Sequence, residues 1–420
     1  MERETGAPAQ PGEWRRGWPV VAAAAVGTGT GAGLFQNLSS LFIIGMIAEF
    51  GWTRGEFATA AGLGVIGGLA IPFLGRLADR VGVRPVIVFC MLMLATTYAS
   101  LTISGGALWQ YQLFVIFVTL SVPGTSTMVY GKLIARRFER HRGIALGVAT
   151  SGISIFSLAL APVVGWFVAG WGWRAGVLSL AALIAFGALP TVLFLLRGER
   201  APPTRPDPDA PEAVAPVEGK TGAETRADSR YWRLAATAAL INFASVGLVT
   251  SLVPLGTDRG LGVGDAAWLV TAFAASQVVG RLVMGYLVDR FPAQGIAAIF
   301  ALISASAFVA LHLPNPGLAL MMLLVFSAGL MHGAENDLLP FLTAKLFGLR
   351  AYGEVYGLLL TISMIGTSTG VIAFGRLHDA TGSYGIALTL AAVTIGLAGV
   401  LFLTLRERPL PHVQAAARPA

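Results

Sequence analysis

The sequence predicts an all-α membrane protein with twelve transmembrane helices in two pseudo-symmetric six-helix bundles. Of its 420 residues, 55% are hydrophobic and only 12% are charged, which is about half the charged fraction of an ordinary soluble domain. Apolar stretches recur along the whole chain, and many reach the roughly 20 residues that a helix needs to cross the hydrocarbon core. These stretches fall into two groups of six on either side of a polar segment.

The apolar stretches set the predicted spans and domain boundaries. The first six spans are expected at about 18–47, 55–75, 86–105, 109–135, 144–168 and 174–196. The second six are expected at about 233–256, 266–288, 295–313, 317–344, 355–375 and 384–405. We therefore expect an N-terminal tail, a first bundle, a linker, a second bundle and a C-terminal tail, at 1–17, 18–197, 198–231, 232–405 and 406–420.

The polar segment between the two groups is predicted to be a flexible linker. Residues 201–230 read APPTRPDPDAPEAVAPVEGKTGAETRADSR and are rich in proline, alanine and charge. Such a segment has too little bulky apolar surface to offset the entropy lost on ordering.

Two landmarks indicate that the halves are duplicates. GRLADRVGVRP begins at Gly75 and GYLVDRF begins at Gly285, so they lie 210 positions apart. Gly147 and Gly357, each opening a small-residue helix after basic residues, have the same separation. Two independent landmarks in one register favour repeated six-helix units.

Basic residues predict how the chain lies in the membrane. Eleven Lys and Arg fall in loops that follow even-numbered spans, against four in the loops on the other side (Arg54, Arg174, Arg259 and Arg376). Cytoplasmic loops carry the excess of such residues. The linker and both termini are therefore expected in the cytoplasm, and the arginine-rich composition fits a bacterial cytoplasmic membrane.

Composition also excludes several functional classes. The single cysteine, Cys90, excludes an intrachain disulfide. The five histidines are scattered, so we expect no metal, no cofactor and no catalytic constellation. The net charge of +7 reflects loop basicity rather than nucleic-acid binding. A monomer in contact with the lipid bilayer is expected, and neither a membrane-embedded enzyme nor a sensor is favoured.

GRLADRVGVRP resembles the loop signature between helices 2 and 3 of the major facilitator superfamily, with a shorter echo at 285–291. The resemblance implies the major facilitator fold. It also implies a gating motif made of Gly75, Asp79, Arg80, Asp289 and Arg290, in which the two aspartates latch one conformation. Ordinary positive-inside chemistry remains an alternative for most of the arginines.

A narrower resemblance is to the bacterial branch of the monocarboxylate transporter and oxalate/formate exchanger family. It is carried by FERHRGIALGVATSG at 138–152, by GRLVMG at 280–285 and by GAENDLLPFLTAKLFGLRAYG at 333–353. The resemblance implies that Arg281 binds the substrate. Asn37 and Gln277 stand where animal members have a lysine and an aspartate, so the animal mode of proton coupling is not expected to transfer.

Arg281 is the charge that most needs an explanation. It lies roughly 12 Å from the end of its helix at Asp289, near the middle of a core roughly 30 Å thick. A central arginine costs at least about 2.5–3.5 kcal/mol, so it must face water or a counter-ion. Its planar fork matches a carboxylate, and Gln277, four residues earlier, lies on the same face. Contact with substrate and a structural ion pair with Glu335 or Asp337 both remain open.

Glu335 and Asp337 are two residues apart, about 200° around a helix, so they cannot both face one cavity. The one on the pathway is expected to carry a proton, and we favour Glu335 for this role. The 210-residue offset maps Arg281, Glu335 and Asp337 onto neutral Ile71, Thr125 and Thr127. Because symmetric packing does not need such charges, the asymmetry points to function. Asn37 and Tyr130 are further candidates for substrate binding.

The sequence thus predicts a secondary active transporter that moves small organic anions, with monocarboxylates favoured, by alternating access between the halves. Coupling is expected through proton symport or anion exchange. The alternative is an exporter of drugs or neutral solutes in which Arg281 has a structural role.

Overall fold

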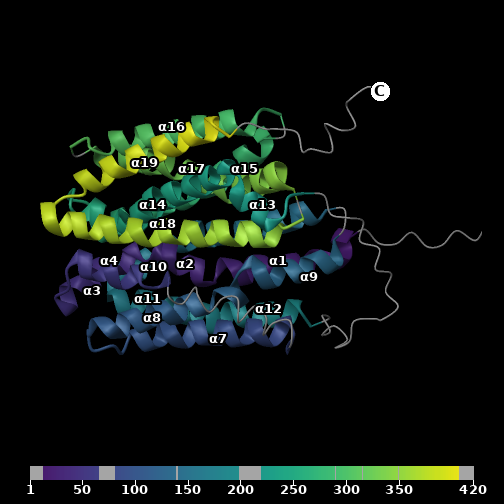
Figure 1. The fold of residues 1–420 in the computed structure, drawn as a ribbon. Coiled ribbons are helices and arrows are strands. Elements are labelled where there is room, and N and C mark those ends of the chain that lie inside the picture. Colours follow the sequence, from purple (N-terminus) through teal and green to yellow (C-terminus); the bar gives the residue numbers. More distant parts are fainter. Residues whose placement is uncertain are drawn as a thin grey trace, which may run out of the picture.

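The computed structural model describes residues 13–65, 81–138, 141–197, 219–288, 290–314, 316–348 and 350–405. Within these ranges the chain is helical, and the one β contact is an isolated bridge between Gly219 and Gly348. The helices run roughly parallel in two groups, one from each half of the sequence (Figure 1).

Helices of the first half correspond to the first six predicted spans. They are α1 (Glu13–Gly29), α2 (Ala32–Leu38), α3 (Ser40–Phe50), α4 (Arg54–Gly62), α7 (Val83–Leu101), α8 (Leu108–Leu120), α9 (Thr127–Arg137), α10 (Arg142–Trp171), α11 (Trp173–Ala182) and α12 (Leu189–Leu195). A 3-10 turn, η1 (Val122–Thr125), joins α8 to α9, and a π-helical segment, η2 (Leu183–Ala188), joins α11 to α12. The span predicted at 55–75 leaves the described residues after 65.

Helices of the second half are longer and mostly unbroken. They are α14 (Ser229–Thr257), α15 (Val263–Val288), α16 (Ala293–Ala310), α17 (Gly317–Phe347), α18 (Tyr352–Thr381) and α19 (Gly385–Leu403). Among the described residues, nine helices are long and apolar enough to cross a membrane, or ten if the bent pair α1 and α2 forms one span. The predicted all-α membrane fold is confirmed, and twelve spans remain consistent with it.

Matching glycine contacts support the duplication of the halves. Gly152 on α10 packs against the backbone of Ala25 on α1, so closely that a side chain there would meet the Ala25 carbonyl. Gly366 on α18 packs in the same way against Ala239 on α14. Each residue of the second pair lies 214 positions after its counterpart. This register differs from the predicted 210 by four residues, about one helical turn.

The first span is broken where it packs against another irregular segment. A 44° bend separates α1 from α2, and a side chain on Gly31 at the bend would collide with Thr125 of η1. The backbone N–H of Ala32 donates to the Thr125 hydroxyl over 3.3 Å. Non-helical backbone is tolerated at membrane depth only where it is buried in protein or lines a cavity. Here the bend between α1 and α2 packs against η1, and the bond to Thr125 satisfies a backbone N–H at the bend.

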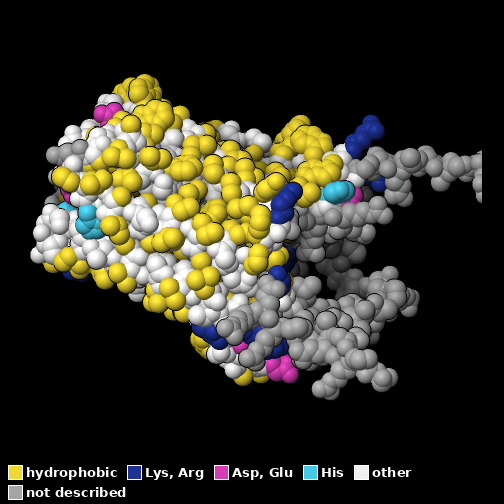
Figure 2. Space-filling view, turned by 90° about the horizontal axis from the view of Figure 1, so that it is seen from above, with side chains coloured by type: hydrophobic (Ala, Val, Ile, Leu, Met, Phe, Trp, Pro, Cys, Tyr) yellow, Lys and Arg dark blue, Asp and Glu magenta, His cyan; other side chains and the backbone are white. Residues whose placement is uncertain are grey.

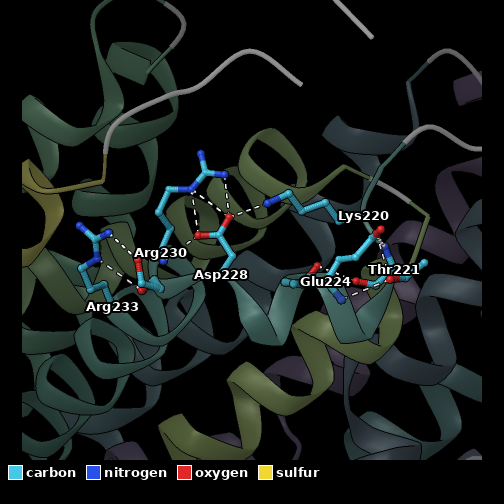
Figure 3. Close-up of polar contacts among 8 residues, drawn as sticks. Lys220, Thr221, Glu224, Asp228, Arg230 and Arg233 are labelled. Atoms are coloured by element: carbon cyan, nitrogen blue, oxygen red, sulfur yellow. Dashed lines mark hydrogen bonds and ion pairs between the residues drawn. The ribbon is translucent and has the colours of Figure 1, made fainter. Parts of the chain in front are cut away.

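The end of the predicted linker is ordered, contrary to the expectation of a flexible segment up to 230. Helix α13 (Gly222–Ala227) begins at a capping box formed by Thr221 and Glu224. Asp228 then caps α14 and accepts bonds from Arg230 and from Lys220, at 2.7 and 2.6 Å (Figure 3). These local bonds, which composition does not reveal, offset the entropy of ordering.

Two ends of the molecule are distinguished by their charges. The end that carries α13 is called the linker end, and the opposite end, where α4 begins, is called the gate end. Figure 2 shows a broad hydrophobic surface on one face, with the visible Lys and Arg side chains gathered toward the linker end. An apolar belt with basic residues on one side is the pattern of a membrane-spanning bundle.

Candidate anion site and the contacts between the halves

Arg281 lies on α15 with its guanidinium incompletely paired. Its Nε lies 3.5 Å from Oδ2 of Asp337 on α17, and the two side chains are 10% and 38% exposed. Nε and Nη1 are buried and make no hydrogen bond. A distance of 3.5 Å gives electrostatic attraction without a well-formed hydrogen bond. Two strong donors therefore lack a hydrogen-bond partner, and the partially exposed Asp337 lies beside them.

Glycines bring α15 and α17 close enough for this pair to form. A side chain on Gly280 would collide with the Leu330 backbone, and one on Gly333 would meet the backbone of Gln277 at 2.5 Å. Small residues of this kind allow the backbones of membrane helices to approach closely. The close approach determines which side of α17 faces Arg281, and Asp337 is on that side.

Two of the predicted binding residues meet in a polar network between the halves. The amide of Asn37 on α2 donates to Ser157 over 2.9 Å, and Gln277 on α15 donates to Asn37 over 3.4 Å. Ser154 on α10 donates to Gln277 over 3.1 Å. Asn37 and Gln277 are both buried. This network joins the halves one helical turn from Arg281.

Glu335 belongs to a separate cluster inside the second half. Its side chain is buried, and its Oε1 accepts a bond of 2.6 Å from Asn242 on α14. Thr367 on α18 donates to the same asparagine over 3.4 Å. Nδ1 of His332 lies 3.8 Å from Oε2 of Glu335, and neither atom makes a hydrogen bond. Glu335 and Asp337 therefore face different surroundings, as their spacing requires.

The other predicted site residues do not join these clusters. Tyr130 is fully buried within the first half, where the hydroxyl end of its side chain packs against Gly27 and the hydroxyl makes no hydrogen bond. Of the gating motif only Arg290 is described; its guanidinium lies 3.7 Å from the ring centroid of Tyr286. Gly75, Asp79, Arg80 and Asp289 lie outside the described residues, so the gating latch stays a prediction.

A cavity of about 350 Å³ lies between the halves on the gate side of the molecule. Its wall contains residues from both halves, including Phe35, Phe57, Tyr111, Thr367, Val371 and Tyr384. The wall is mostly apolar. Arg281 and Gln277 are not among the described lining residues, so the incompletely paired arginine and the cavity are distinct features.

Ionic contacts join the halves at the gate end, beside the cavity. The fork of Arg54 on α4 makes two bonds of 2.6 Å to the carboxylate of Asp258, which follows α14. Its Nη1 also lies 2.9 Å from Nε2 of His378. The backbone N–H of Gly55 donates to Asp379 over 2.8 Å. The halves are therefore locked together at this end.

The sequence provided weak signals for some of the residues that these contacts involve. Ser154 and Ser157 lie three positions apart, on one helical face, but serines in membrane helices commonly bond to their own backbone. Arg54 and Asp258 are 204 positions apart and appear as ordinary loop charges. Thr367 has no distinguishing feature in the sequence.

Comparison with known families decides the classification. The model of the Major Facilitator Superfamily matches residues 21–263 and 234–420, which together include nearly the whole chain. The chain belongs to the major facilitator superfamily. It is therefore a multi-pass membrane transporter and not an enzyme, as the loop motif and the span count predicted.

Several relatives within the superfamily are named monocarboxylate transporters, and those compared are animal proteins. The chain is 27% identical to monocarboxylate transporter 13 of Bos taurus, over 96% of this chain and 91% of that protein. It is also 27% identical to monocarboxylate transporter 11 of Mus musculus, over 97% and 91% respectively. A solved bacterial homologue of the human lysosomal transporter Spinster, inward-facing and occupied, has the same fold, with a TM-score of 0.70. That comparison has 18% identity and covers 95% of this chain and 100% of the homologue.

Proposed function

We propose that this major facilitator protein transports small organic anions, with monocarboxylates the favoured class. The observation that carries the proposal is the Arg281 guanidinium, which is 10% exposed and has two nitrogens without hydrogen bonds. A guanidinium at this depth is costly unless it meets an anion or water. A carboxylate that accepts from the fork would satisfy donors that Asp337 leaves unpaired.

The asymmetry between the halves supports a functional role for this charge. With the structural offset of 214 residues, Arg281 corresponds to Gly67, Glu335 to Ser121 and Asp337 to Pro123. These counterparts are neutral, as were those given by the offset of 210. The ionisable groups are therefore not a requirement of the packing that the two halves share.

Glu335 is proposed as the proton carrier. It is buried, and its Oε2 has no hydrogen-bond partner, so a proton on that atom displaces no existing bond. Asp337 is better placed to be replaced beside Arg281 by the substrate carboxylate, because it is the more exposed carboxylate and the one near the guanidinium. With the linker end in the cytoplasm, the contacts of the gate end lie at the outer face of the membrane.

Counterflow in proteoliposomes tests the proposal. Purified protein is reconstituted with unlabelled lactate or pyruvate inside, and uptake of the labelled acid is followed. The normal protein should exchange both acids, whereas Arg281→Lys should lose at least about tenfold in rate, because lysine keeps the charge but loses the fork. Normal exchange by Arg281→Lys would refute the role of the guanidinium.

Arg233→Lys is the matched control for this experiment. Arg233 lies at the linker end of α14 in the same half and donates to the backbone oxygen of Thr404 over 2.9 Å. It is partly exposed and belongs to neither polar cluster. We expect the control to exchange lactate at the normal rate.

One observation favours the alternative function. The cavity wall is mostly apolar and is separate from Arg281, as would suit an amphipathic or neutral solute. If amphipathic compounds inhibit exchange or are themselves exchanged while lactate and pyruvate are not, the exporter function replaces the proposed one.

A further inference from the structure

We propose that Arg54 is a second carboxylate-binding residue, which captures the substrate at the gate end when the halves separate there. The inference rests on the proposed function and extends it to the opposite face of the membrane. In the closed state the carboxylate of Asp258 occupies the place that the substrate carboxylate takes in the open state.

The geometry of the Arg54–Asp258 pair is that of carboxylate recognition. Both terminal nitrogens of Arg54 donate to Asp258, one to each oxygen, and both bonds are 2.6 Å long. This arrangement of two parallel bonds is the strongest and most specific contact that a guanidinium makes with a carboxylate. The carboxylate of an organic anion presents the same two acceptor oxygens.

The two partners belong to different halves, so alternating access must separate them. Arg54 begins α4 of the first half, whereas Asp258 and His378 come from the second half. Opening of the gate end removes Asp258, His378 and the ring of Tyr384, whose centroid lies 5.4 Å from the guanidinium carbon, from Arg54. The guanidinium then faces the pathway without a counter-ion, because Arg54 already lines the cavity.

The first half supplies further groups that suit an organic acid. Phe57 and Tyr111 stack with ring centroids 4.6 Å apart, and both line the same cavity as Arg54. The Tyr111 side chain is almost fully buried, and its hydroxyl makes no hydrogen bond. An unpaired buried hydroxyl is costly unless a ligand or water satisfies it. These side chains remain with Arg54 when the halves part, and they offer an apolar wall with one polar group.

Two substitutions separate substrate capture from a simple latch. Breaking a latch from either side shifts the conformational balance in one direction, so Arg54→Lys and Asp258→Asn would change the external KM in the same sense. If Arg54 captures the substrate, the two effects are opposite. Arg54→Lys then raises the external KM about tenfold by losing the fork, whereas Asp258→Asn lowers it by removing a competing carboxylate.

The external KM is measured from the uptake of labelled lactate and pyruvate by intact cells that express the full chain. The KM at the linker end is measured in the same way with everted vesicles. We expect Arg54→Lys to change KM at the linker end less than about twofold. Arg174→Lys is the control, because Arg174 pairs with Glu49 within the first half, also at the gate end, and is not among the described lining residues. Its external KM should be normal.

A third variant keeps the test decisive if Arg54→Lys does not fold. Tyr111→Phe removes only the unpaired hydroxyl and should raise the external KM about threefold. Capture by Arg54 is overturned if Arg54→Lys and Asp258→Asn change the external KM in the same direction. It is also overturned if Arg54→Lys leaves the external KM unchanged. If Arg54→Lys does not fold, an unchanged external KM in Tyr111→Phe overturns it. Normal transport by Arg281→Lys overturns only the proposed role of Arg281, and no transport of either acid by the normal protein overturns both proposals.

Discussion

The backbone of Gly333 lies directly against the backbone of Gln277. A Cβ atom at Gly333 would lie 2.5 Å from the Gln277 carbonyl oxygen and 2.6 Å from its Cα. Both neighbours are backbone atoms, so neither can rotate away. This contact fixes the distance between α15 and α17, and through it the position of Arg281 relative to Asp337.

Gly333→Ala should therefore destabilise the protein and disturb the anion site. Forcing an extra methyl group into a packed helix interface costs about 1–3 kcal/mol. We expect a lower thermal unfolding temperature in detergent and a smaller stabilisation by added lactate. Gly357→Ala is the control, since a side chain at Gly357 of α18 meets nothing within 4 Å. An unchanged unfolding temperature for Gly333→Ala would contradict this packing.

Glu335→Gln should uncouple transport from the proton gradient. Glutamine retains an oxygen that can accept from Asn242 but carries no exchangeable acidic proton. Uptake of lactate driven by a pH gradient should fall at least about tenfold, while exchange of lactate for lactate continues. Asp337→Asn is the comparison, and it should impair both modes because Asp337 lies beside Arg281. Undiminished gradient-driven uptake by Glu335→Gln would remove Glu335 from the coupling step.

Gln277→Leu should loosen the contact between the halves at mid-depth. The substitution removes the bond that Gln277 donates to Asn37 and the one it accepts from Ser154. A leucine leaves Asn37 and Ser154 buried with fewer partners, at a cost of about 1–3 kcal/mol. In both proteins the natural Cys90 is replaced by serine and a single cysteine is placed near the network. We expect a thiol reagent to label this cysteine faster in Gln277→Leu than in the protein with the normal Gln277. Labelling at the normal rate would show that this network does not hold the halves together.

Asp228 should make the linker end sensitive to acid. Burial raises its pKa, but bonds from Arg230 and Lys220 outweigh burial and hold the pKa well below the usual value of 3.8. Because the folded protein binds the proton more weakly than the unfolded chain, the stabilisation is complete at neutral pH. It is lost as the pH falls below about 4.

The test for Asp228 compares thermal unfolding at pH 7 and below pH 4 in the normal protein and in Asp228→Asn. Asparagine also caps helices, so the variant keeps the cap while losing the charge. At pH 7 it should be less stable by about 1–2 kcal/mol. The difference should shrink on acidification. A difference that stays constant with pH would show that the charge of Asp228 is not involved.

Much of the fold follows from local sequence. Long apolar runs must be helical in a bilayer because each backbone group needs a partner within its own segment. The predicted spans therefore agree with the described helices to within a few residues at most ends. Arg281 could be singled out for a similar reason, since a charge within an apolar run is conspicuous without any knowledge of its neighbours.

Only tertiary structure decided which residues meet. Spacing alone showed that Glu335 and Asp337 face different ways, but the close approach of α15 and α17 at Gly280 and Gly333 determined that Asp337 faces Arg281. Arg54 and Asp258 are joined across 204 positions, and no local pattern encodes such a contact. Hydropathy and helical period depend on neighbours along the chain, whereas pairing between helices depends on how distant surfaces fit.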